Sequence, residues 1–292
     1  MKKIYNILLI FLLFLSLAGC NNVGHPTIKY TDNNGNEQSE VVSASSNKEY
    51  VKKIVNLLNS IQPEKYSYQM TTQIKQSFEC VLFEQGQNKK NVNYSFSSND
   101  MLIYDHINDV TYNKIQSLNI IADKDIDSIY KSDDKSIVEH IYSDGYSYIN
   151  ENNNKIKIES NKGYLKNNIF YELNLEVLFD IKESFVDDYN LYISDCNKNN
   201  IKFCIDGKKL FNKDTKIFIY VSPHNGLVNK IYYEETSLGY DKLKSMFTET
   251  IMVFENITNS IGIIQFEFIY DNVPDINLTE EQKLEYKSTS AS

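Results

Sequence analysis

The sequence predicts an α+β protein whose body is built on one antiparallel sheet. Short stretches of alternating polar and apolar residues recur along the chain, and turn residues separate them in the manner of hairpins. Two longer stretches with helical periodicity interrupt these predicted strands. No segment repeats with a period of about 20 to 50 residues, which argues against a solenoid.

The N-terminal segment has the pattern of an export signal. A basic start, Met1-Lys2-Lys3, precedes an almost unbroken apolar run of about 14 residues, shorter than the roughly 20 that a membrane-spanning helix needs. The run ends in Leu17-Ala18-Gly19-Cys20. This segment resembles the bacterial lipoprotein signal, whose lipobox is an aliphatic residue, two small residues and a cysteine. The alternative is an ordinary secretory signal or an N-terminal anchor with an incidental cysteine.

The resemblance implies that residues 1–19 are a signal peptide, cleaved before Cys20, and that the Cys20 thiol carries lipid, with palmitate among its acyl chains. The partner so implied is the membrane, and the location is the outer, extracytoplasmic face of the cell membrane. Two or three acyl chains anchor a protein stably, whereas one chain does so only marginally. No later segment reaches membrane-spanning length, so this lipid is expected to be the only anchor.

Three regions are expected in the rest of the chain. Residues 20–46 are polar and poor in large apolar side chains, which predicts a lipidated, flexible tether. A single α+β domain is expected over residues 47–276. The last residues, 277–292, are expected to form a C-terminal tail with one short helix that then frays.

The domain is predicted to begin with an amphipathic helix. Ser46-Asn47-Lys48-Glu49 fits a capping box, because Glu49 follows Ser46 by three residues. Pro63 is expected to stop this helix. One apolar stripe at helical spacing is formed by Val51, Ile54, Val55, Leu58 and Ile61.

Strands are expected to make up most of the remaining domain. The first is predicted over residues 66–75, where large apolar side chains alternate with polar ones. Asp144-Gly145 and Asn225-Gly226 predict tight hairpins, and residues 169–184 form the second helical stretch. Further strands are predicted over residues 78–84, 92–97, 101–106, 138–143, 146–150, 155–159, 191–196, 201–205, 216–221, 228–234, 251–254 and 263–270.

The order of these elements is similar to that of the LolA-like lipoprotein-carrier superfamily. The stretches that carry the resemblance are VKKIVNLLNSIQPEKYSYQMTTQI, EHIYSDGYSYINENNNKIKI and TKIFIYVSPHNGLVNKIYY. In that family a first helix leads directly into a long strand, and hairpins build a curved half-barrel sheet with helices on its concave face. The resemblance covers about residues 47–275 and carries over no ligand-binding residue. Such carriers often lack a lipid anchor, so the anchor expected at Cys20 puts soluble lipid shuttling in doubt.

Three cysteines remain besides Cys20, so at most one internal disulfide can form. Cys196 and Cys204 flank a predicted hairpin and could pair outside the cytoplasm. Because cross-strand pairing needs a narrow range of geometry, we favour the alternative that these two and Cys80 are small apolar strand residues.

The only metal pattern is an incomplete calcium loop. Asp123, Asp125 and Asp127 lie at alternating positions, with Asp134 at the twelfth position of the loop, and calcium prefers such oxygen ligands. Ser128 occupies the sixth position, where a calcium loop has Gly, so we favour a solvated acidic turn. The four His residues show no zinc-binding spacing, and no cofactor is expected.

Composition argues against one class of function and leaves three. A net charge of −9 and the lack of Arg argue against binding of nucleic acid. The leading hypothesis is a non-enzymatic module that binds an apolar or peptide-like ligand on the concave face, which the 22 Tyr and 15 Phe could line. The alternative is a regulatory or sensor lipoprotein that binds a partner protein's extracytoplasmic domain. An enzyme is the third option, since no GxSxG, P-loop or GxGxxG motif occurs.

A cavity between sheet and helices discriminates between the first two hypotheses. Apolar space of roughly 300 Å³ or more would favour a bound ligand. A filled core would instead favour a partner protein that docks on the surface.

Overall fold

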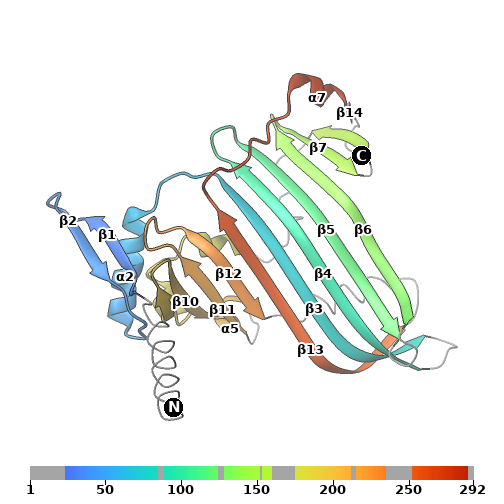
Figure 1. Ribbon diagram of the computed structural model, residues 1–292, viewed down its shortest axis with the longest axis horizontal. Coiled ribbons are helices and arrows are strands. Elements are labelled where there is room, and N and C mark those ends of the chain that lie inside the picture. Colours follow the sequence, from blue (N-terminus) through green and yellow to red (C-terminus); the bar gives the residue numbers. More distant parts are fainter. Residues whose placement is uncertain are drawn as a thin grey trace, which may run out of the picture.

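A computed structural model describes residues 24–84, 89–123, 128–151, 153–159, 175–211, 215–234 and 252–288. Within these ranges, 12 strands form one sheet in the order β14-β8-β7-β6-β5-β4-β3-β13-β12-β11-β10-β9. The sheet is curved and open, because its two edge strands do not pair with each other (Figure 1). The predicted fold class, an α+β fold built on a large curved antiparallel sheet, is confirmed, and the helices are few.

Five long strands form the middle of the sheet, and the shorter strands lie on either side of them. The long strands are β3 (Tyr68–Glu84), β4 (Lys90–Asp105), β5 (Val110–Asp123), β6 (Ser128–Ser143) and β13 (Met252–Ile269). The shorter strands are β7 (Tyr146–Glu151), β8 (Asn154–Glu159), β9 (Tyr192–Asn197), β10 (Asn200–Asp206), β11 (Lys216–Val221), β12 (Val228–Glu234) and β14 (Lys287–Ser288). Neighbouring strands are antiparallel except β14 and β8, which pair in parallel.

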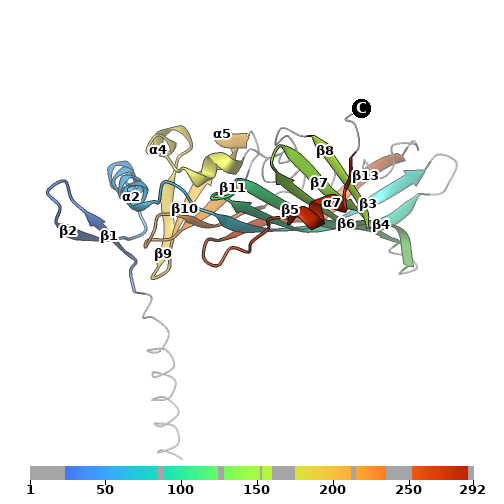
Figure 2. The same cartoon turned by 90° about the horizontal axis from the view of Figure 1, so that it is seen from above.

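Helices are short apart from α2 (Lys48–Ile61). The others in the described residues are the 3-10 helix η2 (Leu175–Phe179), α4 (Phe185–Asp188), α5 (Gly207–Phe211) and α7 (Glu280–Leu284). Figure 2 shows α2 and α4 on the same side of the sheet. We call this side the inner face and the opposite side the outer face.

The alternation of side chains along each strand separates the two faces. On β3, Tyr68, Met70 and Ile74 are buried on the inner face, whereas Gln73 and Lys75 are exposed on the outer face. The same alternation, combined with the register, places Phe266 of β13 beside Thr72 of β3 on the inner face.

The core lies between α2 and the inner face. Val51, Ile54, Val55 and Leu58 of α2 are almost fully buried and belong to one cluster with inward-facing strand residues such as Phe203. Burial of each such aliphatic side chain contributes about 1.5–3 kcal/mol. The predicted stripe of α2 is therefore confirmed, except that Ile61 is only partly buried.

The expected flexible tether over residues 20–46 needs correction. Its described part forms a hairpin of β1 (Thr27–Thr31) and β2 (Glu37–Val41). Ile28 and Val42 have no exposed surface, and two backbone hydrogen bonds join Ser45 to Ile193 at 2.9 and 3.0 Å. The segment is polar overall, but a few apolar residues are enough to attach it, because α2 and the edge strand β9 lie beside it and offer surfaces for packing.

Four element boundaries also differ from the prediction. The side chain of Asn47, and not that of Ser46, caps α2 by accepting a hydrogen bond from the amide of Tyr50 at 3.0 Å. The two strands expected over residues 92–97 and 101–106 are the single strand β4. Likewise, the two expected over 251–254 and 263–270 belong to the single strand β13, and the two over 66–75 and 78–84 to β3.

The second predicted helix, over residues 169–184, is wrong where the structure describes it. Only Leu175–Phe179 is helical, as a 3-10 turn, and residues 180–184 form an irregular segment before α4. Residues 169–174 of this prediction lie outside the described residues. Of the apolar residues on which this prediction rested, Leu178 and Ile181 are buried, whereas Val177 is 42% exposed.

The chain closes the β8 edge with its C-terminal segment. The expected short helix is α7, with a capping box between Thr279 and Gln282. After it, Lys287–Ser288 pairs with β8 instead of leaving the domain. A salt bridge between Lys283 and Asp144 at 2.9 Å ties α7 to the β6–β7 hairpin, whose Asp144-Gly145 turn is confirmed.

Candidate functional site

The predicted lipidation site lies outside the described residues. Leu17, Ala18, Gly19 and Cys20 are not among them, so lipidation of Cys20 stays a prediction. Among the residues that are described, no helix has the length and apolarity needed to cross a membrane.

The other cysteines are thiols in the described structure. Cys80 and Cys204 are buried, and Cys196 is half-buried. The β9–β10 hairpin pairs Cys196 with Ile201 and Cys204 with Tyr192, so the register separates the two sulfur atoms that could have paired. Burial raises the pKa of the Cys80 thiol to about 11, which makes it a poor nucleophile at neutral pH.

The calcium pattern does not form a complete loop. Asp123 is the last residue of β5, and Asp125 and Asp127 lie outside the described residues. The stretch from Ser128 to Asp134 belongs to β6, and an extended strand lacks the tight coil of a twelve-residue calcium loop. Across the residues that the structure describes, no three His, Cys, Asp or Glu side chains group as metal ligands.

Aromatic rings gather at one end of the inner face. Tyr68 lies at the centre of this cluster, with ring-centroid distances of 5.4 Å to Phe179 and 5.6 Å to Tyr104. The rings of Phe268 and Tyr270 follow at 6.2 and 6.5 Å. These distances suit tilted and edge-to-face ring contacts, so the cluster is a firm apolar wall.

The sheet register brings these rings together. Tyr68 of β3 is directly opposite Tyr104 of β4, and on the other side of β3 Phe268 of β13 is opposite Met70. Phe179 comes from η2, far away in the sequence, and its ring also lies 4.9 Å from that of Phe268. Of these rings, the alternation of residues 66–75 predicted only Tyr68.

A hollow of about 310 Å³ opens beside this cluster, and we call it the aromatic hollow. Tyr66, Tyr68, Tyr104 and Phe179 form its apolar wall. Its polar lining consists of Glu64, Lys65, His106, Thr111 and Glu176. An apolar wall with a few polar groups is the usual construction of a small-ligand site.

The wall is held in place by a buried hydrogen bond. The hydroxyl of Tyr270, next to Tyr66 at a ring distance of 5.3 Å, donates to the carbonyl oxygen of Val228 at 2.6 Å. Burial raises the pKa of Tyr270 far above its usual range, and the neighbouring Tyr66 adds to this effect. Tyr270 therefore stays neutral and keeps donating at any physiological pH.

Buried polar residues continue along the inner face from the hollow, and sequence reasoning missed those of β4. Thr72 and Asp100 face each other on β3 and β4 and are 0% and 5% exposed. The hydroxyl of Ser98 donates to the Asp100 carboxylate at 2.6 Å. The signal was present in the sequence, because polar residues at 72, 98 and 100 occupy inward positions of otherwise apolar strands.

Comparisons with known proteins give little beyond the fold. No family model and no curated protein matches this chain. A crystal structure of a LolA superfamily protein from Nitrosomonas europaea is similar with 9% sequence identity and a TM-score of 0.17. The match covers 82% of this chain and 99% of that one. At this low similarity, no residue role and no activity can be assigned to this chain from that structure. The fold class is therefore assigned from the sheet itself.

Proposed function

We propose that this chain is an exported lipoprotein, held on the outer face of the cell membrane through lipid on Cys20, whose body binds a ligand without converting it. The ligand is apolar or peptide-like and occupies the aromatic hollow. The observation that carries this proposal is the hollow itself, whose volume of about 310 Å³ lies at the lower end of the range of small-ligand sites.

The lining of the hollow supports an apolar ligand. Tyr66, Tyr104 and Phe179 are half-buried, so part of each ring remains open to the hollow. Covering these rings with an apolar group is favourable at about 25 cal/mol for each Å² removed from water. The acidic and basic residues at the rim, Glu64 and Lys65 among them, suit a ligand with a polar end.

The folded hairpin brings the proposed anchor close to the body. Cys20 precedes Thr27, the first residue of β1, by seven residues, so the chain between them spans at most about 25 Å. A lipid on Cys20 would thus keep the body near the bilayer surface, where apolar ligands concentrate.

A regulatory or sensor lipoprotein that binds a partner protein is the second candidate. Ile107, in the turn between β4 and β5, is 86% exposed, and Ile269, at the end of β13, is 52% exposed. Both lie at the same end of the sheet, because Tyr104 of β4 is opposite Tyr68 and Ile269 is opposite Gln69. Exposed apolar side chains of this kind are common where proteins dock.

Native mass spectrometry tests the ligand hypothesis. The chain from residue 21 contains every described residue and would be purified gently from its own host. We expect a bound mass that denaturation releases. Tyr104→Ala should weaken the affinity up to about tenfold and thereby lower the occupancy, because a lost ring contact costs up to about 1.5 kcal/mol. Tyr232→Ala, which removes a half-buried ring from the outer face, is the matched control and should keep the ligand.

Two results would overturn the proposal. A bare protein mass after gentle purification would show that no ligand is held and would favour the partner-binding alternative. Equal occupancy in the Tyr104→Ala and wild-type chains would place the ligand away from the aromatic hollow.

A further inference from the structure

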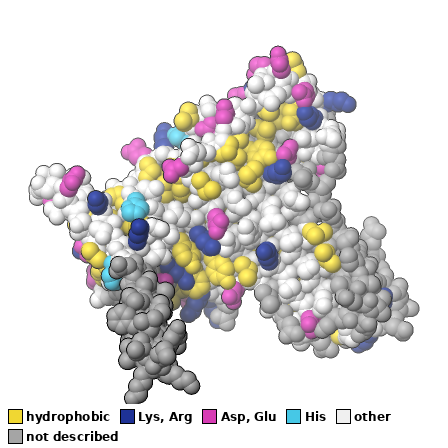
Figure 3. Space-filling view, in the orientation of Figure 1, with side chains coloured by type: hydrophobic (Ala, Val, Ile, Leu, Met, Phe, Trp, Pro, Cys, Tyr) yellow, Lys and Arg dark blue, Asp and Glu magenta, His cyan; other side chains and the backbone are white. Residues whose placement is uncertain are grey.

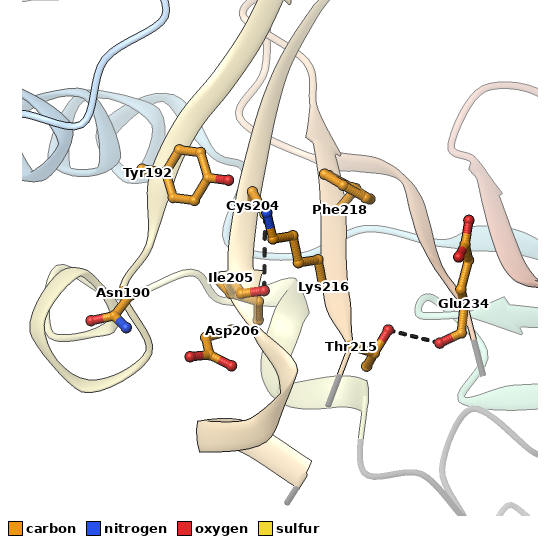
Figure 4. A pocket seen from close by; sticks show the side chains of 9 residues that line it. All are labelled: Asn190, Tyr192, Cys204, Ile205, Asp206, Thr215, Lys216, Phe218 and Glu234. Atoms are coloured by element: carbon orange, nitrogen blue, oxygen red, sulfur yellow. Dashed lines mark hydrogen bonds between the residues drawn. The ribbon is translucent and has the colours of Figure 1, made fainter. Parts of the chain in front are cut away.

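A second hollow, of about 710 Å³, lies on the outer face of β9–β12, opposite the face that α2 covers. Its lining includes Asn190, Tyr192, Asp206, Lys216, Phe218 and Glu234 (Figure 4). The buried thiol of Cys204 lies at its floor. This hollow shares no lining residue with the aromatic hollow, so a ligand here is independent of the proposed function.

The register of the sheet sets three charges in one row. Asp206 of β10 is opposite Lys216 of β11, and Glu234 follows on β12, where Ile217 is opposite Tyr233. Ile205, Ile217 and Tyr233 alternate with these residues and belong to the core with α2, so the charged row faces outward.

The ammonium group of Lys216 is unused within the described part of the chain. No hydrogen bond or ion pair engages it there, although carboxylates lie on both neighbouring strands. Asp206 instead accepts from the amide of Lys208 at 3.0 Å. By contrast Lys230, on the same outer face, reaches Glu267 at 3.4 Å. Lys216 thus offers three donors to a ligand oxygen.

Figure 4 shows how the groups divide the hollow. Lys216 extends from β11 toward Cys204 on β10, between Tyr192 and Phe218, whereas the carboxylate of Glu234 lies on the far side of β11. Figure 3 shows hydrophobic side chains and lysines together on this face over β10, β11 and β12. The Lys216 ammonium and the Glu234 carboxylate are therefore separated by the floor of the hollow, which is flanked by aromatic rings.

We infer that this hollow binds a short peptide with free termini, with its carboxylate on Lys216 and its terminal ammonium on Glu234. A ligand with only negative charge would be repelled by two carboxylates, and a ligand with only positive charge would be repelled by Lys216. The backbones of Lys216 and Glu234 lie on neighbouring strands, but the Lys216 side chain extends over β10, which is two strand spacings, about 9.6 Å, from β12. An extended tripeptide spans about 10 Å. A volume of about 710 Å³ accommodates such a ligand and one apolar side chain between Tyr192 and Phe218.

Equilibrium dialysis of the full chain in lipid nanodiscs tests this inference. The probe is radiolabelled Gly-Phe-Gly with free termini, compared with its C-terminal amide and its N-acetyl form. We expect one bound probe per chain and an affinity at least about tenfold lower for each blocked form, as the loss of a charged hydrogen bond predicts.

The Lys216→Gln variant locates the carboxylate. It should weaken the free peptide about tenfold and leave the affinity for the amide unchanged, because the amide has no charge for Lys216 to bind. Lys230→Gln, which removes a lysine of the same face that is already paired, is the control and should bind as wild type. Lys216 is exposed, and Lys230 is half-buried with one surface ion pair to Glu267. Thermal melts of both variants check that folding is retained.

Three outcomes would overturn the inference. They are an absence of binding of Gly-Phe-Gly to the wild-type chain, equal binding of the free and blocked probes, and wild-type affinity in Lys216→Gln. None of these outcomes bears on the aromatic hollow, because neither variant changes a residue that lines it.

Discussion

Replacing Gly226 by Ala should destabilise the protein strongly, because two separate penalties fall on one position. Gly226 has φ of +69°, a left-handed conformation that costs an L-residue about 1–2 kcal/mol. An added Cβ would also lie 2.3 Å from the carbonyl oxygen of Leu58 and 3.1 Å from its carbonyl carbon. These are backbone atoms of α2, so the helix or the turn must move, at a further cost of about 1–3 kcal/mol.

The two terms together predict a loss of roughly 2–5 kcal/mol in the free energy of unfolding. Gly145→Ala is the matched control, because Gly145 has φ of +80° but no atom within 4 Å of an added Cβ. It should therefore lose only the conformational part, about 1–2 kcal/mol.

Urea unfolding followed by far-UV circular dichroism measures both losses, provided that the slope with denaturant is the same in each variant. The reasoning is refuted if Gly226→Ala and Gly145→Ala destabilise the protein equally. That result would mean that the turn after β11 does not pack closely against the end of α2.

Two further predictions concern charge and burial. Lys48 and Lys52, at 2.8 and 3.0 Å, hold the pKa of Asp187 at about 2, below its usual value of 3.8. The resulting stabilisation is present above pH 4 and is lost as the pH falls toward 2. The melting temperature of the wild type should therefore fall more between pH 4 and pH 2 than that of Asp187→Asn. Parallel curves of melting temperature against pH for the two proteins would contradict this. Iodoacetamide at pH 8 should modify half-buried Cys196 before buried Cys80, as peptide mass spectrometry can show, and the reverse order would contradict the burial of Cys80.

Local patterns predicted the elements whose shape depends on their own residues. Asp144-Gly145 forms the expected hairpin because both residues adopt the positive φ that such a turn requires, 54° and 80°. The apolar stripe of α2 is buried for a similar reason, since helical spacing alone puts its members on one side.

The same reasoning failed where a strand is held by its neighbours. Ser98 and Asp100 are polar and resemble a turn, so the sequence suggested a break between two strands. They are instead inward-facing residues within β4, where β3 pairs with both of them and β5 pairs with Ser98. Backbone hydrogen bonds from two neighbours outweigh the low strand preference of such residues.

Sequence alone determined the properties that belong to short segments, namely the Asp144-Gly145 turn, the amphipathic helix α2 and the alternation that makes a sheet. The tight hairpin predicted at Asn225-Gly226 is instead a longer turn, in which the amide of Ser222 donates to the carbonyl oxygen of Leu227. Only the tertiary structure decided the sites, because their parts are distant along the chain. The aromatic hollow joins Tyr68, Tyr104 and Phe179, and the outer hollow joins Asp206, Lys216 and Glu234. Each set meets only through strand register and packing, which depend on the whole sheet and not on any one segment.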